Sequence, residues 1–271
     1  MWGVLCNQNS REGIKKERVK VALSIAGSDP TGGAGLQADL KVFRSFKVHG
    51  LSIVSAITAQ NTKEVDSVFP VEMDSFKKQF HTLLSDIRPD AIKMGMLYSS
   101  WAVEIVEEII REYSLGNFVI DPVTVSSSGI SLVAEGTLDA LREKLFPISK
   151  VITPNIYEAS VLTGIRVEDK KGMEEAAKAL KDLGPEGVII TGGHLKEVAV
   201  DLYYDGKSHY MKSKKIEGEY HGTGCVFSSA ITASLALGNT PLESVRKAKE
   251  FIVKAIKKAH YPGKGMGLLY I

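Results

Sequence analysis

The segment Val19–Phe43 reads VKVALSIAGSDPTGGAGLQADLKVF, and its pattern decides the fold. It begins with a nearly continuous apolar run, which is typical of a β-strand whose two faces are both covered by other elements. A glycine-rich turn follows, and apolar residues then recur at helical spacing over residues 35–48. The stretch therefore predicts a strand, a tight turn and a helix, which together form the first half of a β-α-β unit.

The same alternation continues along the chain. Apolar runs expected to form strands precede segments with helical periodicity, in the pairs 51–59 and 74–87, 91–97 and 101–113, and 117–123 and 138–146, and the run 150–155 precedes two such segments at 156–164 and 172–184. Three further strands are expected at 187–194, 198–206 and 207–216, with a hairpin turn at Asp205-Gly206, before two helices at 224–238 and 242–260. The alternation predicts an α/β protein with a mostly parallel sheet. We find no internal repeat or linker, and therefore expect one domain over residues 19–271 and a loose extension over residues 1–18.

Composition narrows the classes of function. The chain has 271 residues, and its net charge of +2 gives no electrostatic reason to expect a nucleic-acid or membrane partner. The two cysteines, Cys6 and Cys225, form no CxxC pair and belong to no cluster with metal-ligand spacing, so we expect neither a zinc site nor a disulfide scaffold. No apolar run is long enough to span a bilayer, and the first 20 residues lack the pattern of a signal peptide. We therefore expect a cytoplasmic protein.

The glycine-rich loop at residues 27–35 matches neither of two common phosphate-binding motifs. Gly33-Ala34 stands where a P-loop needs lysine followed by serine or threonine. GAGLQA, from Gly33, fits a dinucleotide fingerprint, but the next strand ends without the acidic residue that binds a ribose hydroxyl. A tight turn accounts for some of the glycines, and we favour close approach of a ligand to the backbone as the reason for their density.

A second glycine-containing turn, HGTGC at residues 221–225, precedes an apolar helix. The amides of Gly222, Thr223, Gly224 and Cys225 at a helix N-terminus can converge on one anion, and the helix dipole favours that arrangement. The same field favours a thiolate, so Cys225 could accept a proton from an attacking alcohol. The alternative is that Cys225 is a small apolar residue that fills space.

The motifs GSDPTGGAGLQADLK, TAQNT, KMGML, DPV, TPNIYEA, TGGH and HGTGC occur in this order, and together they resemble those of the hydroxymethylpyrimidine and phosphomethylpyrimidine kinases of thiamin biosynthesis. The resemblance extends from Val21 to the last helix. It implies a ribokinase-like three-layer α/β/α sandwich with a mostly parallel central sheet. It also implies an ATP- and Mg²⁺-dependent homodimer that phosphorylates 4-amino-5-hydroxymethyl-2-methylpyrimidine and then its monophosphate.

The resemblance also implies roles for single residues. Gly222, Thr223 and Gly224 would form the anion hole, and Cys225 would be the base. The substrate pocket would be lined by Gln60, Asp39, Gly27, Ala34, Met96 and Val123, with Gln60 reading the pyrimidine through its amide. Asn155, Thr191 and Gly193 would contact the nucleotide, and Glu158 and Asp121 would hold magnesium. Without the resemblance, Glu158 is equally well explained as an acid at a helix N-terminus, and Met96 and Val123 as core residues.

Three departures from the family pattern bear on the nucleotide site. Lysine is absent after DPV, Thr191 stands where lysine is common, and the usual Asn-Thr before His221 is replaced. Lys93 is one basic residue that could compensate. Two other functions stay open at this point. A pyridoxal or pyridoxine kinase would phosphorylate a similar flat heteroaromatic alcohol, and a non-catalytic sensor would bind the pyrimidine phosphate without turnover.

Overall fold

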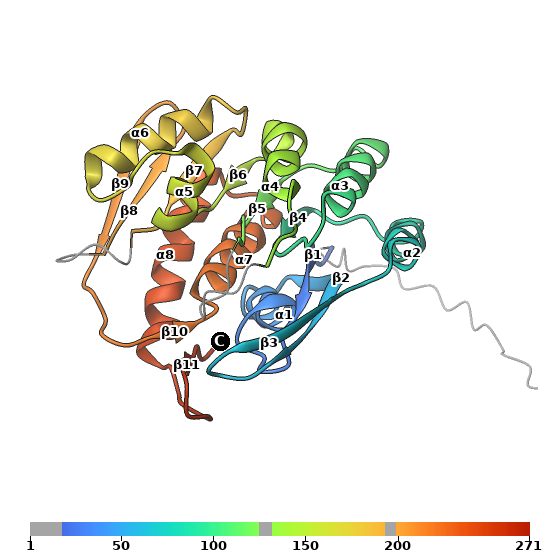
Figure 1. Cartoon of the computed structure of the whole chain (residues 1–271), viewed down its shortest axis with the longest axis horizontal. Coiled ribbons are helices and arrows are strands. Elements are labelled where there is room, and N and C mark those ends of the chain that lie inside the picture. The colour runs from blue at the N-terminus through green and yellow to red at the C-terminus, as the bar shows by residue number, and fades with distance from the viewer. Residues whose placement is uncertain (1–17, 125–131, 193–198) are drawn as a thin grey trace, which may run out of the picture.

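The computed structural model describes residues 18–124, 132–192 and 199–271, and in these residues it contains the expected sheet (Figure 1). Nine strands lie in the order β3-β2-β1-β4-β5-β6-β7-β8-β9. The strands are β1 Val21–Ser28, β2 His49–Gln60, β3 Val65–Pro70, β4 Ala91–Met94, β5 Phe118–Ile120, β6 Val151–Ile152, β7 Gly187–Ile190, β8 Ala199–Tyr204 and β9 Ser208–Ser213. A separate short ladder pairs β10, Tyr220–His221, with β11, Gly267–Leu268.

Most of this sheet is parallel, as the alternating pattern predicts. Every pairing from β2 across to β7 is parallel. The β8–β9 hairpin turns at Asp205-Gly206, and β8 runs antiparallel to β7. At the opposite edge β3 runs antiparallel to β2, in a segment for which the sequence analysis expects no strand. An edge strand has one neighbour and is only partly buried, so it does not need the apolar run by which the other strands are found.

Eight α-helices cover the two faces of the sheet in the described residues. They are α1 Gly35–Ser45, α2 Met73–Leu84, α3 Ser100–Glu112, α4 Thr137–Ala140, α5 Ile156–Thr163, α6 Lys170–Lys181, α7 Thr223–Ala236 and α8 Pro241–Lys257. The helix expected at 138–146 is shorter than predicted. It widens into a π-helical turn over 141–145 and ends in a 3₁₀ turn at Pro147, because proline has no amide hydrogen to continue the helix.

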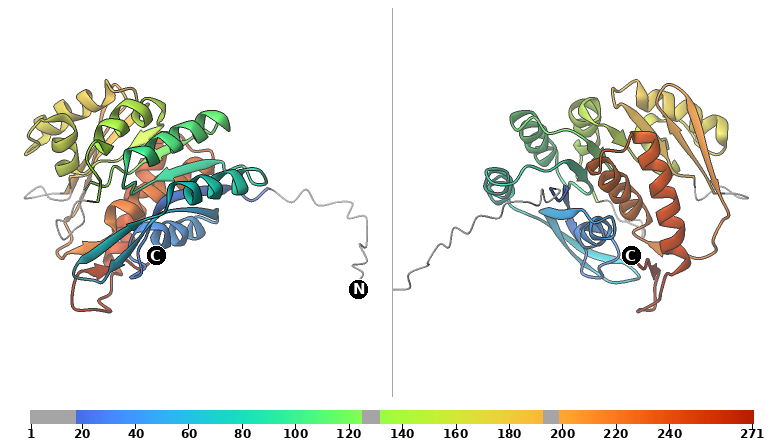
Figure 2. Two further views of the ribbon diagram at one scale, coloured as in Figure 1. Left: turned by 45° about the vertical axis from the view of Figure 1, so that its right-hand side comes forward. Right: turned by 180° about the vertical axis from the view of Figure 1, so that it is seen from behind.

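The helices divide into two layers, which gives the α/β/α sandwich (Figure 2). One core contains side chains of α2 to α6, and the other contains side chains of α1, α7 and α8. Successive residues of the central strands alternate between the two cores, with Leu23 and Ile25 of β1 in the first and Ala22 in the second. This alternation explains why the parallel strands have continuous apolar sequences.

Helix α7 lies in the interior, and its position decides where the candidate site is. Every residue from Val226 to Ala236 is buried. Because the helix is covered by α1, by α8 and by the sheet, its apolar residues are not confined to one stripe. Its first turn lies near the carboxyl ends of β1, β4 and β5, where open parallel sheets bind ligands. In the described part of the chain, no helix combines the length and the apolar character needed to cross a membrane.

Candidate active site

The N-terminus of α7 brings residues 222–225 to the carboxyl ends of the parallel strands. Gly222 precedes the helix with φ +79°, and a Cβ atom there would run into the carbonyl oxygen of Gly33. The first backbone hydrogen bond of α7 ends on the Gly222 carbonyl oxygen, at 2.9 Å. The amides of Thr223, Gly224 and Cys225 therefore belong to the first helical turn, in which the helix itself offers no acceptor. This geometry is the one that an anion site at a helix N-terminus requires.

Cys225 is half-buried in this first turn, and its electrostatic surroundings differ from expectation. Burial, together with the charges of Asp121 and Asp39 and against the effect of Lys93, raises the pKa of the thiol to about 12. The field of the helix N-terminus was expected to lower this pKa, and for the protein without ligands that expectation is wrong. Lost hydration and two nearby carboxylates outweigh the helix dipole, so Cys225 is a thiol at neutral pH in this state.

The Cys225 thiol adjoins three buried charged side chains, and we call these four residues the buried charge cluster: Lys93, Asp39, Asp121 and Cys225. Lys93 on β4 is completely buried, and its Nζ lies 2.9 Å from each carboxylate oxygen of Asp39 on α1. The same Nζ is 3.9 Å from Asp121, which follows β5. Burial alone would lower the pKa of Lys93, but the charges of Asp39, Cys225 and Asp121 raise it above its usual value. The ammonium group is therefore kept charged by its neighbours although the side chain is shielded from bulk solvent.

Asp39 is not placed as the sequence analysis predicts. Its carboxylate is completely buried, and the hydroxyls of Ser24 and Ser229 donate to it, the second at 2.6 Å. With Lys93 these donors engage both oxygens, so the side chain has no free edge toward a ligand. The predicted place of Asp39 in a pocket wall is therefore corrected to a place in the interior of the protein. There the carboxylate joins α1, β1, β4 and α7.

Asp121 and Glu158, the predicted metal ligands, are both buried, and the charge of Asp121 acts on Glu158. Burial raises the pKa of Asp121, and the charge of Lys93 opposes this. Burial, followed by the charge of Asp121, raises the pKa of Glu158 to about 8. Two buried carboxylates that interact in this way form a suitable donor set for a divalent cation, which would favour the charged form of both.

The alternative explanation of Glu158, as an acid at a helix N-terminus, is also correct. The Asn155 amide donates to Glu158 Oε2, and the Glu158 amide donates to Asn155 Oδ1, both at 2.9 Å, which forms a capping box at the start of α5. The described residues include no group of three or more histidine, cysteine, aspartate or glutamate side chains arranged for a metal. The two carboxylates still fit magnesium, because this ion takes few protein carboxylates and keeps several waters.

The predicted apolar wall residues do come together. Met96 lies in a small cluster with Ala56 and Leu132, against which Val123 packs. Gly27 is next to this cluster, and a Cβ atom on it would lie 2.6 Å from Met96 Cε. Met96 and Val123 thus belong to one patch of apolar side chains near the carboxyl ends of β1, β4 and β5. This position agrees with both predictions, a wall of the substrate pocket and a place in the core.

Close contacts within the chain account for two of the glycines in the loop after β1. A Cβ atom on Gly35 would meet the carbonyl oxygen of Gly27, and one on Gly33 would lie 2.8 Å from His221 Cδ2. These glycines let segments of this chain approach each other closely. Packing of the loop against itself and against His221 therefore explains them without a ligand.

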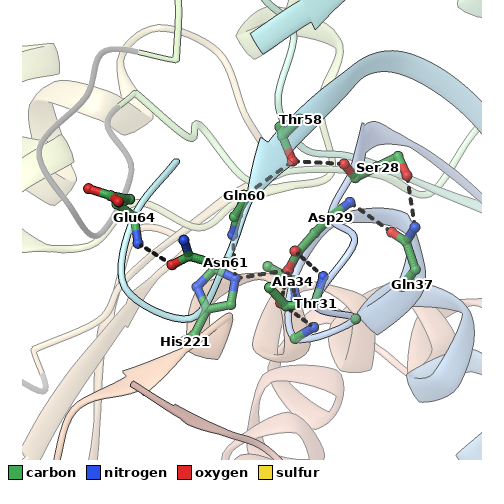
Figure 3. Close-up of polar contacts among 12 residues, drawn as sticks. Ser28, Asp29, Thr31, Ala34, Gln37, Thr58, Gln60, Asn61, Glu64 and His221 are labelled. Carbon is green, nitrogen blue, oxygen red and sulfur yellow. Dashed lines mark hydrogen bonds and ion pairs between the residues drawn. The ribbon is translucent and has the colours of Figure 1, made fainter. Parts of the chain in front are cut away.

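Gln60 lies in a set of polar contacts that we call the loop network: Gln60, His221, Asp29, Thr58 and Ser28 (Figure 3). His221 Nε2 is 2.9 Å from Gln60 Nε2 and 2.9 Å from Asp29 Oδ2. Asp29 in turn accepts hydrogen bonds from the amides of Thr31 and Ala34, both at 2.8 Å. Ala34, a predicted pocket residue, is therefore fixed at the start of α1 by the network that holds Gln60.

The sequence analysis assigns no role to Asp29 or His221, although both lie inside quoted motifs. They are 192 residues apart, and a single hydrogen bond joins the loop after β1 to the turn before α7. Burial opposes ionisation of Asp29, yet the hydrogen bonds from His221 and Thr31 hold its pKa below the usual value. In the sequence, each of these two motifs shows a polar residue with no assigned role, and nothing in either motif reveals that Asp29 and His221 form a pair.

The expected nucleotide residues lie on the far side of α7 from Gln60. Asn155 and Thr191 form a bridge between β6 and β7, and the Thr191 amide donates to the Pro154 carbonyl oxygen at 3.0 Å. Asp201 accepts from the Gly192 amide at 3.1 Å. Gly193 lies outside the described residues, so its predicted contact with the nucleotide stays a prediction.

Comparison with known proteins identifies the family. A family model described as phosphomethylpyrimidine kinase matches residues 29–270. The chain belongs to the phosphomethylpyrimidine kinase family. A hydroxymethylpyrimidine/phosphomethylpyrimidine kinase of Streptomyces coelicolor is 39% identical over 91% of this chain and 92% of the relative. A pyridoxine kinase of Bacillus subtilis is 44% identical over 88% of this chain and 90% of the relative.

Membership of the phosphomethylpyrimidine kinase family agrees with the observed fold. The crystal structure of an ADP complex of Bacillus subtilis pyridoxal kinase superimposes with a TM-score of 0.86 at 41% identity, covering 93% of this chain and 97% of that chain. The expected ribokinase-like sandwich is confirmed, and so is the expectation that the chain is a phosphotransferase.

Proposed function

We propose that this kinase transfers the terminal phosphoryl group of ATP to 4-amino-5-hydroxymethyl-2-methylpyrimidine and then to its monophosphate, as thiamin biosynthesis requires. One observation carries the proposal. The first turn of α7 lies beside the buried carboxylate of Asp121, since a Cβ atom on Gly224 would lie 3.8 Å from Asp121 Oδ1, and the charge of Asp121 in turn acts on the buried Glu158. Phosphoryl transfer depends on such positioning and on neutralisation of charge more than on covalent chemistry.

In this proposal the helix end holds the phosphoryl group in transfer. The amides of Gly222, Thr223 and Gly224 donate to its oxygens, and Gly224 is exposed, so the helix end is open to a ligand. Cys225 accepts the proton of the attacking hydroxyl group. Glycine at 222 and 224 removes side chains that would block the approach of the phosphate.

Asp121 and Glu158 are the residues that would hold Mg²⁺. When bound, the ion would neutralise the carboxylates and part of the phosphate charge. Among the neighbouring charges Lys93 has the largest effect on Cys225 and lowers the pKa of the thiol, and neutralisation of Asp121 would remove one of the two charges that oppose this effect. Lys93 would thus compensate, from the interior, for a lysine that the family carries after DPV.

ATP is proposed as the phosphoryl donor because the similar pyridoxal kinase of Bacillus subtilis was crystallised with ADP. Asn155, Thr191 and Gly193 are the residues that we propose to contact the nucleotide. The proposal further includes a homodimer in the cytoplasm that takes small-molecule substrates and neither nucleic acid nor membrane. Sedimentation of the purified protein at several concentrations tests the dimer, because a monomer at micromolar concentration would contradict it.

A second candidate is phosphorylation of pyridoxine or pyridoxal. The similarity to the Bacillus subtilis pyridoxine kinase, 44% against 39% for the Streptomyces coelicolor enzyme, favours it. Both substrates are flat heteroaromatic rings with a hydroxymethyl group, and an apolar pocket separates such rings by only a modest factor.

The test is a substrate comparison with the full chain. The protein is incubated with ATP, Mg²⁺ and, separately, hydroxymethylpyrimidine, its monophosphate and pyridoxine, and each phosphorylated product is measured by mass. Mono- and diphosphate from the pyrimidines are the expected result. Phosphorylation of pyridoxine alone would establish the second candidate in place of the first. Tight pyrimidine binding without turnover would contradict both and indicate a sensor.

A further inference from the structure

Two atoms of the loop network, one on His221 and one on Thr58, each lie within hydrogen-bond distance of two other polar groups (Figure 3). His221 Nε2 lies 2.9 Å from two groups, Asp29 Oδ2 and Gln60 Nε2. Thr58 Oγ1 also lies near two groups, 3.0 Å from the Ser28 carbonyl oxygen and 3.2 Å from Gln60 Oε1. Each of these two atoms carries at most one hydrogen, so each can donate to only one of its two neighbours at full strength.

Asp29 determines which ring nitrogen of His221 carries the hydrogen. A carboxylate only accepts, so Nε2 has to carry a hydrogen and donate it to Asp29 Oδ2. The other ring nitrogen agrees with this, because Nδ1 is buried and no described residue bonds to it. A hydrogen on Nδ1 would be buried without a partner, which is costly. Since Nε2 donates, it cannot accept a hydrogen from the Gln60 amide.

The hydroxyl hydrogen of Thr58 is determined in the same way. The Ser28 carbonyl oxygen only accepts, so the Thr58 hydroxyl donates to it, and the Thr58 oxygen is left to accept. The atom of Gln60 that faces Thr58 then has to be the amide nitrogen, and the atom that faces His221 has to be the amide oxygen. Exchanging the two ends of the amide leaves every heavy-atom position unchanged, because oxygen and nitrogen have nearly the same shape. The opposite orientation would set two donors against each other at His221 and two acceptors against each other at Thr58.

We propose that the Asp29–His221 pair is a specificity-determining pair that locks the Gln60 amide, with its oxygen toward the imidazole and its nitrogen toward Thr58. One amide hydrogen and one lone pair of the oxygen then remain for a ligand, in a fixed order. The proposal rests on the function proposed above, in which Gln60 contacts the ring of the substrate. His221 and Asp29 are positioning residues, since they act through Gln60.

A fixed order of donor and acceptor favours the pyrimidine over pyridoxine. The exocyclic amine of the pyrimidine donates and the ring nitrogen beside it accepts, so they match one orientation of the amide and oppose the other. The hydroxyl groups of pyridoxine can each donate or accept, so they tolerate both orientations. A buried polar group left without a partner lowers the affinity for a ligand strongly, whereas shape alone separates these rings modestly. Loss of the fixed Gln60 orientation should therefore lower kcat/KM for the pyrimidine and leave kcat/KM for pyridoxine nearly unchanged.

The first test measures the lock without any substrate. Long-range ¹H–¹⁵N correlation spectra of the full chain report which ring nitrogen of each histidine carries hydrogen. The chain contains six histidines, so the signals of His221 are assigned by their loss in His221→Gln. A hydrogen on Nε2 is the expected result. A hydrogen on Nδ1 alone would overturn the proposal whatever the enzyme phosphorylates.

The second test measures kcat and KM separately for hydroxymethylpyrimidine and for pyridoxine. His221→Leu removes the donor and should lower kcat/KM for the pyrimidine by about 10- to 100-fold, mainly through KM, with a change of less than about threefold for pyridoxine. His221→Gln keeps an N–H near the position of Nε2 and should recover most of the selectivity. Equal losses for both substrates, or the same result for Gln and Leu, would reduce His221 to a packing residue. A wild-type enzyme inactive on the pyrimidine would contradict the proposed function, and the spectra alone would then decide the lock.

Discussion

The buried charge cluster and the loop network lie on the two sides of one turn, residues 221–225, and are built from opposite materials. In the cluster, Lys93 and Asp39 are completely buried and neutralise each other at 2.9 Å. In the loop network, Gln60 is half-buried and its nearest partners are a ring nitrogen and a hydroxyl. Charges without water produce a strong field that suits phosphoryl transfer. The neutral amide of Gln60, with its hydrogen-bond donor and acceptor, can discriminate between ligands. The comparison indicates that the buried charge cluster serves phosphoryl transfer, whereas the adjacent loop network serves recognition of the substrate ring.

The largest expected effect is on stability and comes from the cluster. Lys93→Met leaves Asp39 buried without its counter-charge, and removal of one partner of a buried ion pair costs about 3–5 kcal/mol. The free energy of unfolding in urea measures this loss. The matched control is Lys93→Met with Asp39→Asn, which removes both charges and should recover part of the stability.

The double variant keeps this prediction decisive if Lys93→Met alone gives no folded protein. If the single and double variants unfold at the same urea concentration, the Lys93–Asp39 ion pair makes no measurable contribution to the free energy of unfolding. That result would contradict the contrast drawn between the cluster and the loop network.

The next effect is on turnover. Cys225 is the half-buried member of the cluster, so its replacement separates chemistry from stability. Cys225→Ala should lower kcat by about a hundredfold or more if the sulfur takes the proton, while the free energy of unfolding changes little. Initial rates with ATP and saturating pyrimidine measure this. Turnover within a few fold of the wild type would assign Cys225 to packing and remove it from the mechanism.

A third effect tests the turn that joins the two regions. Gly222 has φ +79° and faces the Gly33 carbonyl oxygen, whereas Gly238 has φ +88° and no atom near the position of an added Cβ. Gly238→Ala should cost about 1 kcal/mol of the free energy of unfolding from backbone strain alone. Gly222→Ala should cost at least about 2 kcal/mol, because strain and collision add. Equal losses would show that the approach of Gly222 to Gly33 is not a constraint.

The smallest effect is the pH dependence of stability without metal. Since the pKa of Glu158 is raised to about 8, the folded protein holds a proton there that the unfolded chain releases at lower pH. The folded state thus binds more protons between about pH 5 and pH 8, so the free energy of unfolding falls as pH rises through this window, by at least about 1 kcal/mol. Glu158→Gln should flatten the slope. Addition of Mg²⁺ at pH 8 should stabilise the wild type more than this variant, and an equal response would contradict a metal at Glu158.

Much of the fold was predictable because it repeats a local rule. Each parallel strand is an apolar run followed by a helical pattern, and the Asp205-Gly206 hairpin has its own turn signal. The edge strand β3 and the short ladder of β10 and β11 lack such signals, because one partner and partial burial suffice for them. Similarly, Cys225 and Glu158 were found through their motifs. Asp39 was assigned to the wrong place because a motif reports position along the chain and not depth.

The sequence by itself determined the family, the alternation of strands and helices, and the helix N-terminus that carries Cys225. These are properties of neighbouring residues, so their physical cause lies within a few positions of the chain. Only the tertiary structure decided that Lys93 faces Asp39 across 54 residues and that His221 faces Asp29 across 192. It also decided the directions of the pKa shifts of Cys225 and Glu158, because loss of hydration depends on what the rest of the chain packs around a group.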